Sequence, residues 1–500
     1  MSIQNEDRDH SLSAIMVIFG GTGDLTQRKL MPALYNLVHD KLLPEHFAVV
    51  SVGRKDKTSE QYRKEVFDSL NEYSRNKIDE KYWASLGDLI HYSRLDFTDL
   101  SAYAKLNEFL EELDEKFHTE GNRVFYLAVA PEYFETIVHG LYTSHISERE
   151  GSWTRLVIEK PFGKDLMTAR RLNNKLIEVF KEDSIYRIDH YLGKEMIQNI
   201  MVLRFCNCVF ESLWSNKFID NIQISLNEKY GVGTRGGYYE TSGAMRDMVQ
   251  SHIVQILSLV AMEPPVNLKI EAIRTEKLKV LQSLEDFSPE LLRKNVVFGQ
   301  YGKGTIDGTP VLAYRDEEKV PRDSGTETFV AVKLYINNLR WAGTPFYVRT
   351  GKRLSTTSSE IVIQFKSLPN ILYFKDKYSQ KPNLLVIRIQ PNVGVSFQFN
   401  TRNFNIHNDI VSTKMDASHI NSVSGNTPEA YERLIYDILR GDATLFSRWD
   451  EVEASWIFAD KIILYREQKK FSFPNYEAGT MGPVRAFELL ARDGREWWKI

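Results

Sequence analysis

Residues 14–25 read AIMVIFGGTGDL, a continuous apolar run that ends in a glycine-rich turn. An unbroken apolar run of this kind is typical of a strand buried on both faces within a parallel sheet. After the turn, residues 24–38 carry apolar side chains at roughly helical spacing, which predicts a helix. The order of strand, glycine turn and helix therefore predicts the first unit of a Rossmann-type fold.

Further apolar runs alternate with helical segments through the first part of the chain. They lie at residues 47–52, 123–130 and 156–158. Alternation of strands and helices favours an α/β fold with a doubly wound parallel sheet. We therefore expect residues 1–190 to form a dinucleotide-binding Rossmann domain.

The pattern changes after about Leu192, where strand-like runs follow one another without regular helices between them. This arrangement predicts a larger α+β domain with a mostly antiparallel sheet over residues 191–500. Within it, residues 243–262 are a candidate for one long helix. The expected strands are residues 222–226, 328–336, 360–365, 384–389 and 394–399.

The composition is that of an ordinary globular protein of 500 residues with a formal net charge of -3. No overall positive field therefore attracts nucleic acid or an anionic membrane. The polar N-terminus lacks the apolar core of a signal peptide. The longest apolar run, residues 253–262, is about half as long as the ~20 residues that span a bilayer. We expect a cytoplasmic protein with no nucleic-acid or membrane partner.

Cys206 and Cys208 are the only cysteines, with one residue between them. Such a pair excludes a disulfide framework and fits a reducing compartment. A metal site needs more soft ligands nearby than this stretch offers. We expect ordinary packing of the two thiols and no metal site.

The turn that follows the first strand is the predicted pyrophosphate site. Glycines let the backbone approach the phosphates, and a helix N-terminus offers N–H groups and the positive end of its dipole. Read as G-x-G-x-x-G, the motif lacks its third glycine, because Thr26 stands there. The strand before the turn and the helix after it support the assignment. The residues concerned are Gly20, Gly21, Thr22, Gly23 and Asp24.

The end of the second strand, Ser51 to Lys55, indicates the type of coenzyme. Folds that bind NAD place an acid there for the ribose 2′-hydroxyl, whereas folds that bind NADP place an arginine nearby for the 2′-phosphate. Arg54 offers bidentate phosphate contact, and Lys55 adds positive charge. We therefore expect NADP, with NAD as the second choice. The alternative is a solvated basic turn.

Two polar motifs follow strands of the first domain. Lys160 closes one strand, where the carboxyl ends face the ligand crevice, so we expect it to reach both nicotinamide and sugar. Residues 187–194 read RIDHYLGK, in which His190, Tyr191 and Lys194 offer several hydrogen bonds to a phosphate dianion. If these residues form a helix, His190 and Lys194 share one face. A surface lysine and an ordinary helix start are the alternatives.

A histidine stands in the predicted long helix. On an α-helix, His252 lies about 140° from Asp247, so the two are not a local pair. If His252 is catalytic, its carboxylate partner comes from elsewhere, and Asp189 is the candidate. The alternative is a hydrogen-bonded histidine of the core.

Taken together, these motifs resemble those of the glucose-6-phosphate dehydrogenase family over nearly the whole chain. The most specific motif is RIDHYLGK at residues 187–194. The other matching stretches are residues 20–25, 157–163, 236–252, 340–352, 449–456 and 478–498.

The resemblance implies oxidation of glucose 6-phosphate at C1 with hydride transfer to NADP, the first step of the oxidative pentose phosphate pathway. It implies that His252 is the general base, and that Asp189 pairs with it. An imidazole accepts a proton well near neutral pH. A homodimer or homotetramer is also implied. Positions that match substrate contacts are His190, Tyr191, Lys194, Lys160, Glu228, Asp247 and Lys352, and those that match the coenzyme site are Gly20, Gly21, Thr22, Gly23, Asp24, Leu25, Arg54 and Lys160.

The chain departs from the family pattern in two places. The turn after the second strand usually reads Gly-x-Ala-Arg, whereas here Gly53 precedes the retained Arg54. Many members also carry a second basic residue five positions after the one that matches Lys352, where this chain has Thr357. We expect this substrate contact to be absent or to be supplied by Arg353.

Two other functions fit parts of the pattern. A sugar dehydrogenase of the glucose–fructose oxidoreductase type joins similar domains and uses a Glu-Lys-Pro segment, but it does not need the phosphate-binding cluster. A catalytically silent NADP-binding sensor keeps the fold without the reaction. The sugar dehydrogenase would act on a free sugar in place of a phosphorylated one. The silent sensor would bind NADP without reducing it.

Overall fold

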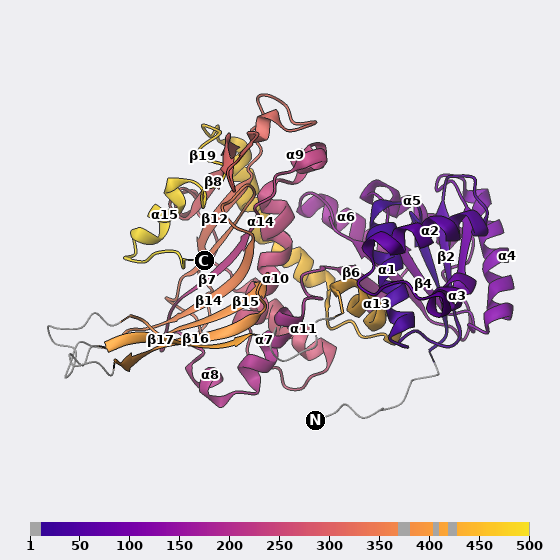
Figure 1. The fold of residues 1–500 in the computed structure, drawn as a ribbon, viewed down its shortest axis with the longest axis horizontal. Helices are drawn as coiled ribbons and strands as arrows, with labels where there is room; N and C mark the ends of the chain where they lie inside the picture. Colours follow the sequence, from indigo (N-terminus) through magenta and orange to yellow (C-terminus); the bar gives the residue numbers. More distant parts are fainter. Residues whose placement is uncertain (1–11, 369–380, 404–409, 419–427, 500) are drawn as a thin grey trace. The chain divides into compact units, whose positions relative to one another are not determined.

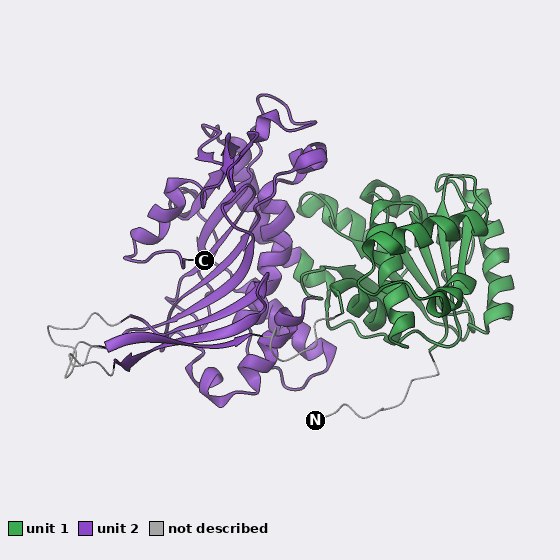
Figure 2. Ribbon diagram, in the orientation of Figure 1, with its two compact units in different colours: residues 1–193, 426–452 green, residues 194–425, 453–500 purple. Residues whose placement is uncertain are grey.

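The computed structural model describes residues 12–368, 381–403, 410–418 and 428–499. The chain divides into two compact units, Met1–Gly193 with Asn426–Val452 and Lys194–Gly425 with Glu453–Ile500 (Figure 2). The first division lies close to residue 190. The sequence pattern does not predict that Asn426–Val452 belongs to the first unit. No local signal marks which sheet a short strand joins.

The first unit contains a largely parallel sheet (Figure 1). Its described strands follow the order β18-β6-β5-β4-β1-β2-β3, and every neighbouring pair is parallel except β18 with β6. Strands 3-2-1-4-5-6 in this order make the doubly wound dinucleotide-binding sheet, so the predicted fold class is confirmed. The strands are β1 (Ala14–Phe19), β2 (Phe47–Gly53), β3 (Ile90–Arg94), β4 (Arg123–Leu127), β5 (Thr154–Glu159), β6 (Ile185–Ile188) and β18 (Phe446–Ser447).

The apolar runs explain why this sheet forms the interior of the unit. β1, β2 and β4 are buried along their whole length, as continuous apolar strands require. Capping boxes start α2, from Thr58 to Gln61, α6, from Asp165 to Thr168, and α13, from Glu429 to Glu432. The described helices are η1 (Thr26–Leu30), α1 (Met31–His39), α2 (Ser59–Tyr73), α3 (Glu80–Leu89), α4 (Leu100–Phe117), α5 (Phe134–Thr143), α6 (Leu166–Ile177) and α13 (Ala430–Arg440).

The second unit contains the larger sheet, in the order β17-β16-β15-β14-β7-β13-β12-β8 over the described residues. β7 and β13 are parallel, and the other neighbouring pairs are antiparallel. The mostly antiparallel sheet is confirmed. The predicted runs fall on strands, but β8, β13 and β17 are not predicted. The strands are β7 (Ile219–Asn227), β8 (Val296–Gly299), β12 (Phe329–Leu334), β13 (Phe346–Gly351), β14 (Ser358–Phe365), β15 (Leu384–Gln390), β16 (Gly394–Arg402) and β17 (Ile410–Ser418).

The predicted long helix is helical but not uniformly α. A break at Gly243, with a φ of +59, separates α9 from the following π-helix η5, which continues into α10. η5 packs on β7 and β13, and α10 packs against α7 and α11. The helices are α7 (Glu195–Phe205), α8 (Cys208–Leu213), α9 (Gly236–Ala244), η5 (Met245–Ile253), α10 (Val254–Ala261), α11 (Ile270–Gln282), α12 (Pro289–Asn295), α14 (Trp449–Gln468) and α15 (Val484–Ala491).

Two further expectations concern the surface. Within the described ranges, no helix combines the length and apolarity that crossing a bilayer demands. Cys206 and Cys208 are both exposed, so the expectation that they pack in the ordinary way is wrong. They stand at the junction of α7 and α8, where the chain turns at the surface.

Candidate functional site

The glycine turn after β1 is closely packed. Gly20 has a φ of +91, and a Cβ there would come within 2.3 Å of a carbonyl oxygen beyond β4. A Cβ on Gly21 would come within 2.5 Å of the Ser51 Cβ. Since neither position has room for a side chain, the backbone of β1 turns directly against its neighbours. This is the geometry that a backbone approaching a pyrophosphate needs.

Thr26 stands where the third glycine is missing, and it closes the turn. It is buried, and its Oγ1 donates to the Gly20 carbonyl at 3.0 Å. The Tyr62 hydroxyl donates to the Gly21 carbonyl at 2.6 Å. The turn is therefore held from inside by side chains, while Asp24 is exposed and forms an ion pair with a neighbouring arginine.

Arg54 is exposed and directly follows β2, the neighbour of β1. The departure at Gly53 has a structural reason, because a Cβ there would lie 2.9 Å from the Tyr92 hydroxyl. That hydroxyl donates to the Lys55 carbonyl at 2.8 Å. The missing methyl group therefore makes room for a tyrosine that fixes the turn carrying Arg54.

Glu159 is the last residue of β5 and Lys160 follows it, and the Lys160–Pro161 peptide bond is cis. The Glu159 carboxylate accepts hydrogen bonds from the hydroxyls of Tyr126, at 2.6 Å, and Tyr431, at 3.1 Å. Burial raises the pKa of Glu159 to about 7, although the two hydroxyls oppose this shift. The sequence gives no signal for this cluster, because Tyr431 belongs to the segment that returns to the first unit.

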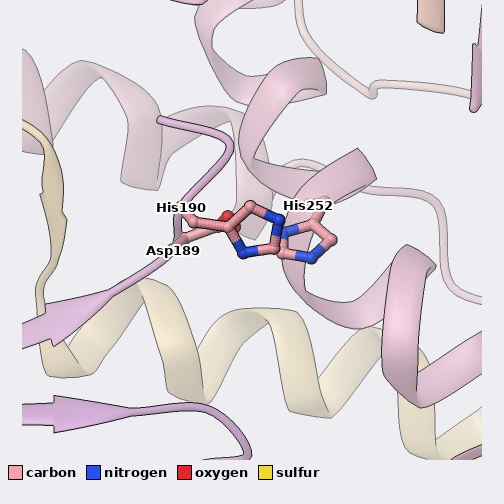
Figure 3. Close-up of side chains that lie close together, drawn as sticks. All are labelled: Asp189, His190 and His252. Carbon is pink, nitrogen blue, oxygen red and sulfur yellow. The ribbon is translucent and has the colours of Figure 1, made fainter. Parts of the chain in front are cut away.

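Asp189, His190 and Tyr191 follow β6. The Asp189 carboxylate is buried, and its Oδ1 accepts from the Tyr191 N–H at 2.9 Å. The rings of His190 and Tyr191 have centroids 5.1 Å apart. Figure 3 draws Asp189 and His190 on the turn after the strand and His252 on its helix.

The first two residues of the RIDHYLGK segment end β6, and the residues that follow form a turn and not a helix. The Asp189 carbonyl accepts from the Leu192 N–H at 2.9 Å, and α7 begins only at Glu195. The condition under which His190 and Lys194 would share a helix face is therefore not met, because Asp189 stabilises the turn with both its carboxylate and its carbonyl. Lys194 instead precedes α7, and its ammonium donates to the side chain of Gln390 at the end of β15.

The predicted groups of the first unit share one edge of its sheet. The glycine turn, Arg54, Lys160 and Asp189 follow β1, β2, β5 and β6 respectively. These strands are parallel, so their carboxyl ends lie at the same edge. Ligands of such sheets bind outside the carboxyl ends of the strands.

In the second unit, Glu228 and Lys352 form an ion pair. Glu228 follows β7 and Lys352 follows β13, and these two strands are parallel neighbours. The Glu228 N–H donates to the Gly351 carbonyl at 2.9 Å. The Lys352 ammonium also lies 5.0 Å from the ring centroid of Tyr239, a residue that sequence reasoning missed.

His252 and Asp247 both belong to η5, and His252 is almost fully buried. At the end of this helix the Val254 N–H bonds to the carbonyl of Ser251 and to the carbonyl five residues back, at Val249. Residues five apart in a π-helix lie about one turn apart. The expected separation of about 140° between Asp247 and His252 is therefore wrong, because it assumes α-helical geometry.

Thr357 and Arg353 have structural partners. The Thr357 hydroxyl accepts from the Lys229 N–H at 3.1 Å. The Arg353 guanidinium pairs with the buried Glu317 at 3.0 Å. Thr357 thus fixes the backbone next to Glu228, and the charge of Arg353 is balanced within the protein.

Fold and residues together define a class of protein. The first unit has the strand order, glycine turn and basic second-strand turn of a dinucleotide-binding domain. The second unit supplies a buried histidine and a lysine–carboxylate pair. These features are those of a nicotinamide-dependent dehydrogenase.

Comparison with known proteins makes the assignment specific. Residues 17–199 match the NAD binding domain of glucose-6-phosphate dehydrogenase, and residues 201–498 match its C-terminal domain. The chain is 48% identical over 487 residues to the glucose-6-phosphate 1-dehydrogenase of Bacillus subtilis (strain 168), covering 97% of this chain and 98% of that one. The chain belongs to the glucose-6-phosphate dehydrogenase family.

Solved structures agree with this assignment. A glucose-6-phosphate dehydrogenase in complex with its substrate glucose-6-phosphate matches with a TM-score of 0.90 at 33% identity, covering 97% of this chain and 99% of that chain. Glucose-6-phosphate 1-dehydrogenase from Mycobacterium avium matches with a TM-score of 0.83 at 32% identity, covering 97% and 98%. Membership of this family excludes the glucose–fructose oxidoreductase alternative.

Proposed function

We propose that this chain oxidises β-D-glucose 6-phosphate at C1 to 6-phospho-D-glucono-1,5-lactone and transfers the hydride to NADP. This reaction is the first step of the oxidative pentose phosphate pathway. The observation that carries the proposal is the match of both family domains, in order, over residues 17–199 and 201–498. The groups at the carboxyl ends of the strands support it.

His252 is the proposed general base. It takes the proton of the C1 hydroxyl as the hydride leaves C1, because a neutral imidazole accepts a proton well near neutral pH. Asp189 is the proposed partner that orients the imidazole and stabilises its charged form. Both side chains are buried, which strengthens an ion pair between them. The proposal requires one ring nitrogen of His252 to face the C1 hydroxyl while the Asp189 carboxylate pairs with the other ring nitrogen.

The remaining polar groups have proposed binding roles. His190, Tyr191 and Lys194 donate hydrogen bonds to the phosphate, because a phosphate dianion accepts several charge-assisted hydrogen bonds. Glu228 and Lys352 already pair with each other, so they present a donor and an acceptor to sugar hydroxyls without adding net charge. Lys160, on the cis turn after β5, and Asp247 are the other proposed sugar contacts.

The residues of the first unit fit a nicotinamide coenzyme. Gly20 and Gly21 leave no space for side chains, and Arg54 and Lys55 offer positive charge for a 2′-phosphate. Thr22, Gly23, Asp24 and Leu25 complete the proposed coenzyme contacts. When bound, the nicotinamide accepts the hydride, while the protein aligns the reactants and moves the proton.

We also propose that the protein is cytoplasmic and forms a homodimer or homotetramer. Family membership supports this proposal. Size-exclusion chromatography with light scattering of the purified full chain tests the assembly, and a monomer at micromolar concentration would contradict it.

The reaction is tested by following the reduced nicotinamide at about 340 nm. The purified chain is assayed with glucose 6-phosphate and with glucose, each with NADP and with NAD. We expect reduction with glucose 6-phosphate and NADP, and kcat/KM lower by at least about 100-fold with glucose, because the phosphate-binding groups are then left unpaired. Binding of NADP without any reduction would instead indicate the silent sensor.

A further inference from the structure

The helix that carries His252 has an unusual C-terminal end. An α-helix leaves its last four carbonyls without backbone partners, and buried carbonyls need donors. α10 ends at Ala261, and the stretch from Leu259 to Met262 is buried. Residues 264 and 265 are prolines, so they have no N–H to donate back as a Schellman motif requires. The donors must therefore come from side chains.

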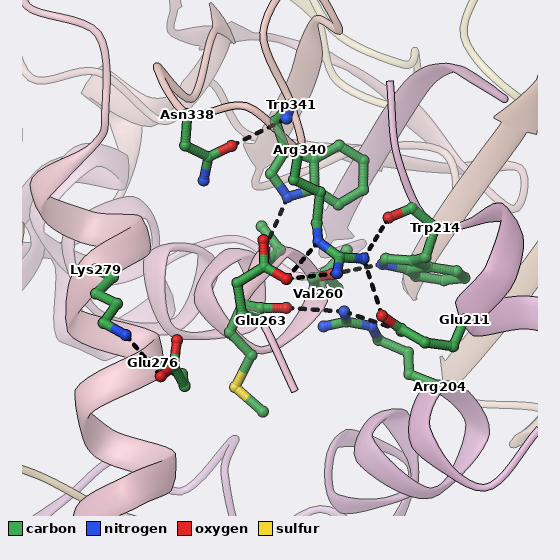
Figure 4. Close-up of polar contacts among 12 residues, drawn as sticks. Arg204, Glu211, Trp214, Val260, Glu263, Glu276, Lys279, Asn338, Arg340 and Trp341 are labelled. Carbon is green, nitrogen blue, oxygen red and sulfur yellow. Dashed lines mark hydrogen bonds and ion pairs between the residues drawn. The ribbon is translucent and has the colours of Figure 1, made fainter. Parts of the chain in front are cut away.

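Three buried side chains supply these donors (Figure 4). The Arg204 guanidinium donates to the carbonyls of Leu259, at 3.0 Å, and Met262, at 2.8 Å. The indole N–H of Trp214 donates to the Val260 carbonyl at 2.8 Å. The indole N–H of Trp341 donates to the Ala261 carbonyl, also at 2.8 Å. We call Arg204, Trp214 and Trp341 the C-cap cluster.

The C-cap cluster is itself fixed by ion pairs. Arg340 donates to the Trp214 carbonyl at 2.7 Å and pairs with Glu211 at 2.9 Å. Arg340 also pairs with Glu263, just beyond the helix. All three members of the C-cap cluster are fully buried, so water does not replace a donor that is lost. Arg340 and Trp341 open the 340–352 motif, in which Lys352 is a proposed substrate contact, but the proposed reaction gives Arg340 and Trp341 themselves no role.

The other end of the same helical segment is held by a carboxylate. The Met245 N–H donates to Glu327 Oε1 at 3.1 Å, and the Ala244 N–H donates to the Glu327 carbonyl at 3.0 Å. A carboxylate at the start of a helix and a guanidinium at its end both complement the helix dipole. The segment from Met245 to Ala261 is thus fixed at both ends, with His252 near its middle.

Because η5 is π-helical, holding the ends of the segment affects the orientation of His252. π-helices are rare, and most of them are single turns within an α-helix. A local return of η5 to α geometry would turn His252 away from Asp247, from about one turn apart to about 140° apart. Anchored ends oppose such a change, because it alters the length and rotation of the segment.

We propose that Arg204, Trp214 and Trp341 are positioning residues for the dehydrogenase reaction, which keep His252 in its reactive orientation by holding the end of its helix. This inference rests on the proposed function. A base misplaced by a fraction of an ångström slows proton transfer while substrate binding persists, so kcat falls and KM does not.

The test compares tryptophan-to-phenylalanine variants of the full chain. Trp214→Phe and Trp341→Phe each remove one indole donor to α10. Trp497→Phe is the matched control, because its buried indole donates at 2.8 Å to the Ala486 carbonyl of α15. We expect similar decreases in Tm for all three variants. Only the first two should lower kcat for glucose 6-phosphate, by about tenfold, with KM for both substrates within about twofold of wild type.

Two further measurements complete the test. Hydrogen–deuterium exchange should show faster exchange over residues 245–262 in Trp341→Phe but not in Trp497→Phe, because only the first loses a hydrogen bond to α10. Arg204→Lys, which keeps the charge, should retain more kcat than Arg204→Met. If kcat falls equally in Trp497→Phe, or stays normal in Trp341→Phe, the inference about the C-cap cluster is wrong. The proposed function is not affected by either result. A wild-type protein without activity refutes the proposed function, whatever the exchange shows.

Discussion

Glu228 and Lys352 form their ion pair because two strands that are far apart in the sequence run parallel and end together. β7 and β13 are in register from Ile222 and Phe346 to Asn227 and Gly351, so the next residue of each strand lies beside the other. The pair is partly buried, with 14% of the lysine side chain and 34% of the glutamate side chain exposed. An ammonium held in this way is ready to contact a polar ligand.

Replacing Lys352 should therefore affect substrate binding. In Lys352→Met, we expect the KM for glucose 6-phosphate to rise about 10- to 100-fold, which is the range for losing a charge-assisted hydrogen bond. Steady-state kinetics with varied glucose 6-phosphate measure this change. Lys333→Met is the matched control, because Lys333 lies on β12 of the same sheet and pairs with Asp493, beyond α15, at 2.6 Å. A similar rise of KM in the control would mean that the sheet, and not the contact, is responsible.

His252→Asn should lower kcat about 100- to 10,000-fold, since general-base catalysis contributes a factor of this size. The dissociation constant of glucose 6-phosphate should stay within a few fold, because a base acts mainly in the transition state. Calorimetry and turnover assays separate the two quantities. His91→Asn provides the control, since His91 is a buried histidine of the first unit. Near-normal turnover in His252→Asn would show that another group is the base.

Arg54→Ala should weaken NADP binding about 10- to 100-fold and leave NAD binding nearly unchanged, because only NADP carries the 2′-phosphate. Fluorescence titration with each reduced coenzyme measures both affinities. Arg94→Ala is the control for general positive charge, as Arg94 is an exposed residue at the end of the neighbouring β3. Equal losses with NADP and NAD would remove the argument for a 2′-phosphate site.

Glu159 should make stability depend on pH. Burial raises its pKa in the folded protein to about 7, above the ordinary carboxyl value, so folding favours the protonated form. This contribution is complete below about pH 4 and is lost as the pH rises through about 7.

Glu159→Gln keeps the side-chain size and removes this titration. Between pH 5 and pH 8, we expect the wild type to lose on the order of 2 kcal/mol of unfolding free energy relative to Glu159→Gln. Denaturant unfolding at several pH values measures the difference. Asp437, whose pKa burial also raises to about 7, titrates in both proteins and cancels. If the unfolding free energies of the two proteins change with pH in the same way, the pKa of Glu159 is not raised.

Much of the fold follows from local patterns in the sequence. The apolar run at residues 14–19 and the turn after it predict β1 and the glycine-rich site, because burial on both faces demands continuous apolar residues. The runs at residues 384–389 and 394–399 likewise fall on β15 and β16. β13 escapes prediction because Arg349 and Thr350 interrupt its apolar pattern, although both are buried in the structure.

Local patterns predict the two kinds of domain, the glycine turn, Arg54 and the motifs around Asp189 and His252, since each depends on residues close together in the chain. Three contacts become visible only in the folded chain, namely Glu228 with Lys352, Tyr431 with Glu159, and Trp341 with the end of the helix of His252. The same is true of the π geometry of η5. Hydrogen bonds and ion pairs between distant segments depend on strand register and packing, and these leave no periodic signal in the local sequence.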